Sequence, residues 1–149
     1  MKHLTIGLLS LTLAGVASAQ DIPTVNKGQW ETAMSMVTEL QVGGERQDID
    51  PEYDFSEECW ATDEDTKLDV NTLGIDNCDV TDSVSTGEFL SLEMACDMEG
   101  IPLTGEAVIV VTPDRDQLQG TLIIEGDMPG MSIKVTGLFS GHKTGACAG

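Results

Sequence analysis

Few residues in this chain could do chemistry: four cysteines, two histidines and a closely spaced pair of methionines. Met34 and Met36 are two residues apart, and a strand would present them on the same face as Trp30. Thioethers bind cuprous copper, and a tryptophan ring can cover a cation. The pattern is consistent with periplasmic copper(I) handling, although filling a core is the commoner use of methionine.

Catalytic residues are harder to assemble. A hydrolase with a Ser–His–acid arrangement would depend on His142, which lies in a glycine-rich tail. Asp114 and Asp116 resemble the start of a calcium loop, but Leu118 and Gln119 occupy the positions where further oxygen ligands should follow. We therefore predict no catalytic residue, no cofactor and no resident metal, and we keep a hydrolase as an alternative.

The cysteines predict covalent cross-links. Cys59, Cys78, Cys96 and Cys147 are separated by 18, 17 and 50 residues, without the paired spacing that a zinc site requires. An even number of cysteines in an exported chain indicates disulfides, here two. Three pairings are possible for four cysteines.

The first residues predict export. Lys2 precedes an apolar run over residues 4–16, and Ala17-Ser18-Ala19 forms a cleavage site, so residues 1–19 are expected to be a signal peptide cut near Ala19-Gln20. The run is shorter than the roughly 20 residues that cross a bilayer. The expected location is the periplasm or the extracellular space. The remaining chain has 26 acids against six Lys and Arg, a net charge of −20 that repels nucleic acid and anionic lipid.

The predicted segments that position these residues follow one another along the chain. Residues 20–28 are expected to be a mobile lead-in, followed by a single disulfide-stapled β domain over residues 29–149. Residues 29–42 alternate between apolar and polar types, which predicts a half-buried strand. Residues 43–66 hold ten acids and one arginine, which predicts a loop. A short helix is expected to begin at Thr62, with Leu68, Val70 and Leu73 on its apolar side.

From Cys78 onward the pattern predicts an antiparallel meander. Pairing Thr112 with Gln117 across a turn sets Ala107 opposite Leu122. Four-residue loops at residues 99–102 and 127–130 extend the same apolar face, with Leu92 opposite Ile109, Leu122 opposite Val135 and Gly120 opposite Gly137. We predict a mainly β fold, a curved antiparallel meander or incomplete barrel of about six to seven strands with one short helix.

The hairpin near Gly87 bears on the disulfides. A three-residue loop, residues 86–88, sets Cys78 directly opposite Cys96, whereas a two-residue loop over residues 86–87 does not. We prefer the pairing Cys78–Cys96, which leaves Cys59 for Cys147. The other two pairings remain open.

One face of the predicted sheet is a candidate apolar pocket. It could hold a hydrophobic small molecule or dock an envelope protein, or its side chains could pack together as an ordinary core. Its residues are Trp30, Met34, Met36, Leu92, Ile109, Leu122 and Val135. The opposite face also carries apolar residues that need cover, namely Val108, Val110, Ile123 and Leu138.

Several short motifs, in order, carry a family resemblance. They are Gly28-Gln29-Trp30-Glu31, Cys78-Asp79-Val80, Met94-Ala95-Cys96, Gly120-Thr121-Leu122 after Asp114, Met128-Pro129-Gly130-Met131 and Gly145-Ala146-Cys147. Together they resemble a family of small exported bacterial proteins classified as a domain of unknown function, DUF3617. Lys27 departs from its pattern, which often has proline there. The resemblance implies an envelope location and a four-cysteine pattern, but no activity.

Overall fold

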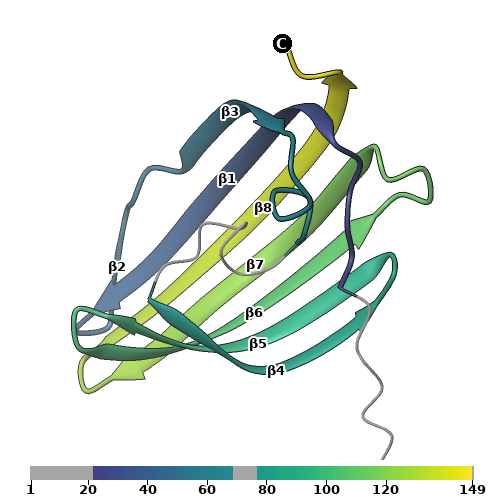
Figure 1. Ribbon diagram of the computed structural model, residues 1–149. Coiled ribbons are helices and arrows are strands. Elements are labelled where there is room, and N and C mark those ends of the chain that lie inside the picture. Colours follow the sequence, from purple (N-terminus) through teal and green to yellow (C-terminus); the bar gives the residue numbers. More distant parts are fainter. Residues whose placement is uncertain (1–21, 69–76, 149) are drawn as a thin grey trace, which may run out of the picture.

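The fold is one antiparallel β-sheet. The computed structural model describes residues 22–68 and 77–148. Its strands follow the order β2-β1-β8-β7-β6-β5-β4, and β3 pairs with β1 (Figure 1). The strands are β1 (Gly28–Val42), β2 (Glu45–Gln47), β3 (Glu52–Trp60), β4 (Cys78–Thr86), β5 (Phe89–Met98), β6 (Ile101–Val111), β7 (Gln117–Met128) and β8 (Met131–Gly145).

The sheet is curved and open, which confirms the predicted mainly β, antiparallel class. Its order ends at β4 on one side and at β2 and β3 on the other, so it does not close into a barrel. Within the described residues it has eight strands, more than predicted, because residues 43–66 do not form the expected loop but contain β2 and β3. The acids are tolerated there because β3 is an edge strand, exposed along nearly all its length.

The predicted short helix is not found in the described residues. Asp65 N–H donates to Thr62 Oγ1 at 3.2 Å, and Thr62 N–H donates to Asp65 Oδ2 at 2.8 Å, as in a helix cap, but only turns follow. Val70 and Leu73 lie outside the described residues. No helix in the described part is long and apolar enough to cross a membrane.

The register of the central hairpin is confirmed, and two others are corrected. Val111 lies opposite Leu118, and Ala107 opposite Leu122, as expected. Across β7 and β8, however, Leu122 pairs with Gly137 rather than with Val135. Across β5 and β6, Leu92 pairs with Ala107, and Ile109 pairs with Leu90. Both errors are shifts of two residues, which leave every side chain on its predicted face.

Tight turns cause both shifts. Met98 pairs with Ile101, so only Glu99 and Gly100 connect β5 to β6, and both have positive φ, 53° and 86°. Positive φ at both central residues defines the type I′ turn, which suits the twist of a hairpin. Met128 pairs with Met131 around a similarly short turn that contains Gly130 at φ 81°. Two-residue turns replace the four-residue loops expected from the sequence.

Gly120 lies opposite Phe139, not opposite Gly137. A Cβ atom on Gly120 would lie 2.1 Å from Phe139 Cζ and 2.4 Å from the carbonyl oxygen of Val108. The missing side chain therefore makes room for the phenyl ring and for the neighbouring strand.

Both preferred disulfides are present, Cys59–Cys147 and Cys78–Cys96, with Cα atoms 5.3 and 4.0 Å apart. The three-residue loop predicted over residues 86–88 is wrong. Thr86 pairs with Phe89, so the turn has two residues, and an irregularity between Val80 and Asp82 restores the pairing of the cysteines. A β-bulge of this kind inserts one residue into one strand only.

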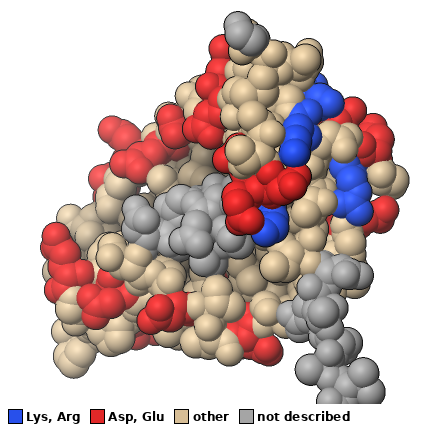
Figure 2. All heavy atoms as spheres, viewed as in Figure 1, with Lys and Arg blue, Asp and Glu red and all other residues tan. Residues whose placement is uncertain are grey.

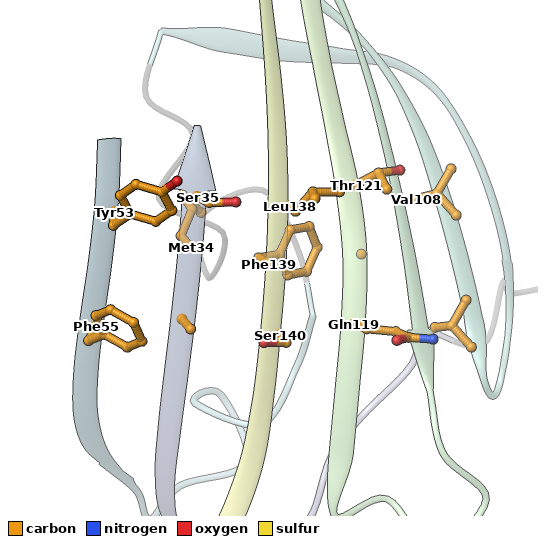
Figure 3. A pocket seen from close by; sticks show the side chains of 13 residues that line it. Met34, Ser35, Tyr53, Phe55, Val108, Gln119, Thr121, Leu138, Phe139 and Ser140 are labelled. Carbon is orange, nitrogen blue, oxygen red and sulfur yellow. The ribbon is translucent and has the colours of Figure 1, made fainter. Parts of the chain in front are cut away.

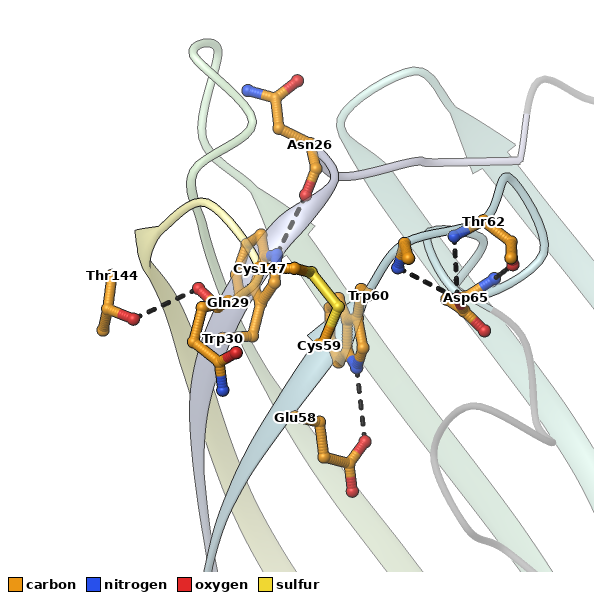
Figure 4. The surroundings of a disulfide bond; sticks show 11 residues. Asn26, Gln29, Trp30, Glu58, Cys59, Trp60, Thr62, Asp65, Thr144 and Cys147 are labelled. Atoms are coloured by element: carbon orange, nitrogen blue, oxygen red, sulfur yellow. Dashed lines mark hydrogen bonds between the residues drawn. A yellow bond between two sulfur atoms is a disulfide. The ribbon is translucent and has the colours of Figure 1, made fainter. Parts of the chain in front are cut away.

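The core lies on the inner face of the sheet. Trp30 is fully buried and stacks on Trp60 with ring centroids 4.8 Å apart (Figure 4). Segments before β1 and after β3 cover this face, where Val25 N–H donates to the carbonyl of Thr66 at 3.0 Å. The core residues are Val25, Trp30, Trp60, Leu68, Leu90, Leu92, Met94, Cys96, Leu103, Ala107, Ile109, Val111, Leu118 and Leu122.

The segment before β1 is attached to the turn between β6 and β7. Arg115, at φ 61° in the turn between β6 and β7, donates from Nη1 to the carbonyl of Thr24 at 2.7 Å. Asn26 Nδ2 donates to Asp116 Oδ1 at 2.8 Å. Residues 22–28, the described part of the expected lead-in, are thus held by hydrogen bonds to the domain.

Candidate binding groove

A groove of about 480 Å³ crosses the outer face of the sheet, opposite the core. It spans β3, β1, β8, β7 and β6, as Figure 3 shows. Its lining residues are Ala33, Met34, Ser35, Tyr53, Phe55, Val108, Val110, Gln119, Gly120, Thr121, Leu138, Phe139 and Ser140.

Strand alternation explains why apolar residues reach this face. Leu122, Leu118 and Ile109 point into the core, so their neighbours Thr121, Val108 and Val110 point out. On β8, Phe139 packs against the core while Leu138 faces outward and is 56% exposed. The inward-facing side chains pack in the core, and the outward-facing ones line the groove.

The aromatic side chains of β3 form one wall of the groove. Tyr53 is 71% exposed and Phe55 is 79% exposed, and both lie on the outermost strand in Figure 3. β1 positions this strand, with Ala33 opposite Phe55 and Ser35 opposite Tyr53. The small side chains of Ala33 and Ser35 leave the space between the aromatic wall and Leu138.

The groove is uncharged although the protein is strongly acidic. None of its 13 lining residues is Asp, Glu, Lys or Arg, whereas such residues make up 22% of the chain. Figure 2 shows many acids and few basic residues on the face seen in Figure 1. Contiguous exposed apolar surface on a soluble protein marks binding sites more often than surface without a role.

Carboxylates line up beside the groove on the outer face. Glu93 lies directly opposite Glu106 on β6 and, on its other side, opposite Asp82 on β4. Like charges in directly opposed positions destabilise a sheet. The acids of this row are all exposed. Farther along, Glu125 pairs with Lys134 at 3.6 Å, so charge there is partly balanced.

The predicted apolar pocket residues lie on the inner face, except that Met34 also borders the groove. Trp30 and Ile109 have no exposed surface, and Leu92 and Leu122 are each 5% exposed, all four within the core. Met34, Met36 and Val135 are partly buried. The residues that the structure brings together on this face therefore fill a core around Trp30, and the groove lies on the opposite side.

The copper candidates are only partly brought together. Met34 and Met36 do share one face of β1. Trp30 stacks on Trp60, and its indole N–H donates to the carbonyl of Asn26 at 2.9 Å (Figure 4). Among the described residues, no cluster of three or more His, Cys, Asp or Glu could hold a metal ion. Copper binding through the two thioethers stays a prediction.

His142 lies at the surface, opposite Glu31 across β8 and β1. Its Nε2 is 3.4 Å from Glu31 Oε2, and both side chains are about half exposed. Hydrolysis through His142 stays a prediction.

The Asp114 turn has a structural use. The Thr112 hydroxyl donates a hydrogen bond to Asp114, which holds the pKa of that carboxyl below its ordinary value of 3.8. The amide of Asn26 donates to the carbonyl of Asp114 at 2.8 Å. The turn thus anchors the segment before β1. Its Thr and Asp side chains form the hydrogen bonds that are typical of turns.

The aromatic wall was not predicted from the sequence. Tyr53 and Phe55 stand two residues apart, with Asp54 between them and Ser56 after them, which is the alternation of a strand. The density of acids around them obscured this pattern. Their period of two was the signal that could have identified β3.

Fold and groove together define a class: a disulfide-linked domain made of one open antiparallel sheet, with the core on its inner face and an apolar groove on the outer face. The sequence matches DUF3617, described as a protein of unknown function, over residues 25–147, and the chain belongs to this family. No curated protein and no solved structure matches it.

Proposed function

We propose that this protein is an exported, non-enzymatic binding domain whose groove accepts apolar groups of a hydrophobic molecule or protein partner. The observation that carries the proposal is the uncharged groove with exposed aromatic and aliphatic walls on an otherwise acidic surface. Its volume of about 480 Å³ falls within the range typical of ligand sites, roughly 300–1,000 Å³.

Disulfides and the leader support export. Both cross-links persist only where thiols are not kept reduced, which favours the periplasm or the extracellular space. The expected signal peptide, which ends at Ala19, would direct the chain to the export machinery.

A neutral apolar dye tests the groove. Nile red should bind the purified, disulfide-bonded protein with a blue-shifted, stronger emission. Leu138→Ser should weaken dye binding, because Leu138 lines the groove. Val84→Ser is the matched control: Val84 is 57% exposed against 56% for Leu138, but it lies outside the groove. Equal binding by both variants and the parent would refute the groove as the binding site.

Intact-mass measurement tests export. After secretion from a bacterial host, the protein should lack residues 1–19 and should gain mass on reduction and alkylation at all four cysteines. An uncleaved leader, or cysteines that alkylate without prior reduction, would contradict an exported, oxidised state.

A further inference from the structure

The outer strand of the groove has a free edge. Within the described residues β3 pairs only with β1, and Figure 1 shows it along the left edge of the sheet. It is nine residues long, Glu52–Trp60. An exposed edge of this length presents unpaired N–H and C=O groups, which form a template for another strand.

The side chains of β3 divide into two rows of different character. On the groove side, Tyr53 and Phe55 are more than two-thirds exposed. On the inner side, Asp54, Ser56 and Glu58 line a smaller cavity of about 250 Å³. A strand added at this edge would place alternate side chains beside each row, because successive side chains point to opposite faces.

Charge selects the strand that fits. The edge carries Glu52, Asp54, Glu57 and Glu58, within a segment of ten acids and one arginine. A second copy would bring the same carboxylates, and like charges opposed across a sheet repel. A basic strand is attracted instead, and complementary charge both steers it and excludes other partners.

We infer that an extended polypeptide segment with alternating apolar and basic residues adds to the free edge of β3. Its apolar side chains lie beside Tyr53 and Phe55 and enter the groove, and its Lys or Arg side chains lie beside Asp54 and Glu58. This inference rests on the proposed function, because it names the partner that extends the same groove. Main-chain hydrogen bonds to β3 supply affinity, and the two side-chain rows supply specificity.

Synthetic peptides test the inference. The probe is a capped nine-residue peptide of alternating Leu and Lys, compared with a peptide of the same composition in two blocks, an alternating Leu and Glu peptide, and an alternating Leu and Lys peptide N-methylated at every second residue. Binding is measured by fluorescence anisotropy on the disulfide-bonded protein. The alternating basic peptide should bind at least tenfold more tightly than each of the other three.

Variants and spectroscopy locate the contact. Asp54→Asn should weaken binding of the alternating basic peptide severalfold, because it removes a carboxylate from the edge. Glu99→Gln is the control, since Glu99 lies in the turn between β5 and β6 and carries the same charge. Amide resonances of residues 53–58 should shift in ¹⁵N spectra on addition of the peptide.

The outcomes separate this inference from the proposed function. If Nile red binds the groove but the N-methylated or block peptide binds as well as the alternating one, edge addition is refuted and the groove remains a binding site. Shifts confined to strands other than β3 also refute edge addition. If neither dye nor peptide binds, both proposals fail together.

Discussion

Replacing Gly120 with alanine tests how closely the central strands approach. The new Cβ would lie 2.1 Å from Phe139 Cζ and 2.4 Å from the carbonyl oxygen of Val108, where real Cβ atoms essentially never come under 3.0 Å. The phenyl ring can rotate away, but the Val108 carbonyl belongs to β6 and can move only with the strand. The substitution therefore forces the sheet apart at its centre.

The cost follows from overpacking. Forcing extra volume into a packed site destabilises by about 1–3 kcal/mol. For a domain of this size, 1 kcal/mol lowers Tm by roughly 4 °C, so Gly120→Ala should lower Tm by roughly 4–12 °C. Gly145→Ala is the matched control on β8, because its Cβ would meet no atom within 4 Å. We expect its free energy of unfolding to stay within about 1 kcal/mol of the parent.

Urea unfolding followed by tryptophan fluorescence provides the assay, since Trp30 and Trp60 stack in the core. Calorimetry gives Tm independently. If both alanine variants unfold at the urea concentration of the parent, Phe139 does not pack over Gly120 and the register of β7 against β8 is wrong.

Three further changes have calculable outcomes. Joint replacement of Cys59 and Cys147 by alanine should lower the free energy of unfolding by about 4–5 kcal/mol in the chain-entropy estimate for a separation of 88 residues; a loss under about 1 kcal/mol in urea titration would contradict it. Glu93→Gln should raise the free energy of unfolding by about 0.2–1 kcal/mol by relieving repulsion from Glu106, and the gain should shrink in high salt; a loss would count against the pairing. Hydrogen bonds from Thr62, within the 61–65 turn, lower the pKa of Asp65 below 3.8. The stabilisation from the Asp65 carboxylate is therefore present above pH 3.8 and fades as pH falls through the lower, folded-state pKa. Asp65→Asn should remove that part of the acid dependence of stability, and identical pH profiles for the variant and the parent would contradict this prediction.

Side-chain faces were predictable here, whereas the offsets of β5 against β6 and of β7 against β8 were not. Alternation placed Leu92, Ile109 and Leu122 inside correctly. Alternation cannot distinguish registers that differ by two residues, because both leave the same residues inside. The offsets were set by the turns, where Glu99 adopts positive φ although it is not glycine. Nothing in the local sequence marks that conformation for a glutamate.

The groove was harder to predict than the core. Val108, Val110 and Leu138 were correctly placed on the outer face, but the sequence did not show which other residues complete the groove. Tyr53 and Phe55 lay in a segment whose acids predicted a loop. Strand propensities apply best to strands with one buried face. β3 is an edge strand that is exposed on both faces, so its residues do not show the usual pattern.

The neutral groove also governs how the protein behaves as it loses charge. At neutral pH the net charge of −19 makes the molecules repel one another, so the groove is kept away from other copies. Near the isoelectric point of about 4.1 that repulsion vanishes, while the groove keeps its hydrophobic side chains. Mild acid should therefore convert a monodisperse solution into one that clusters through this surface, a transition that light scattering can follow.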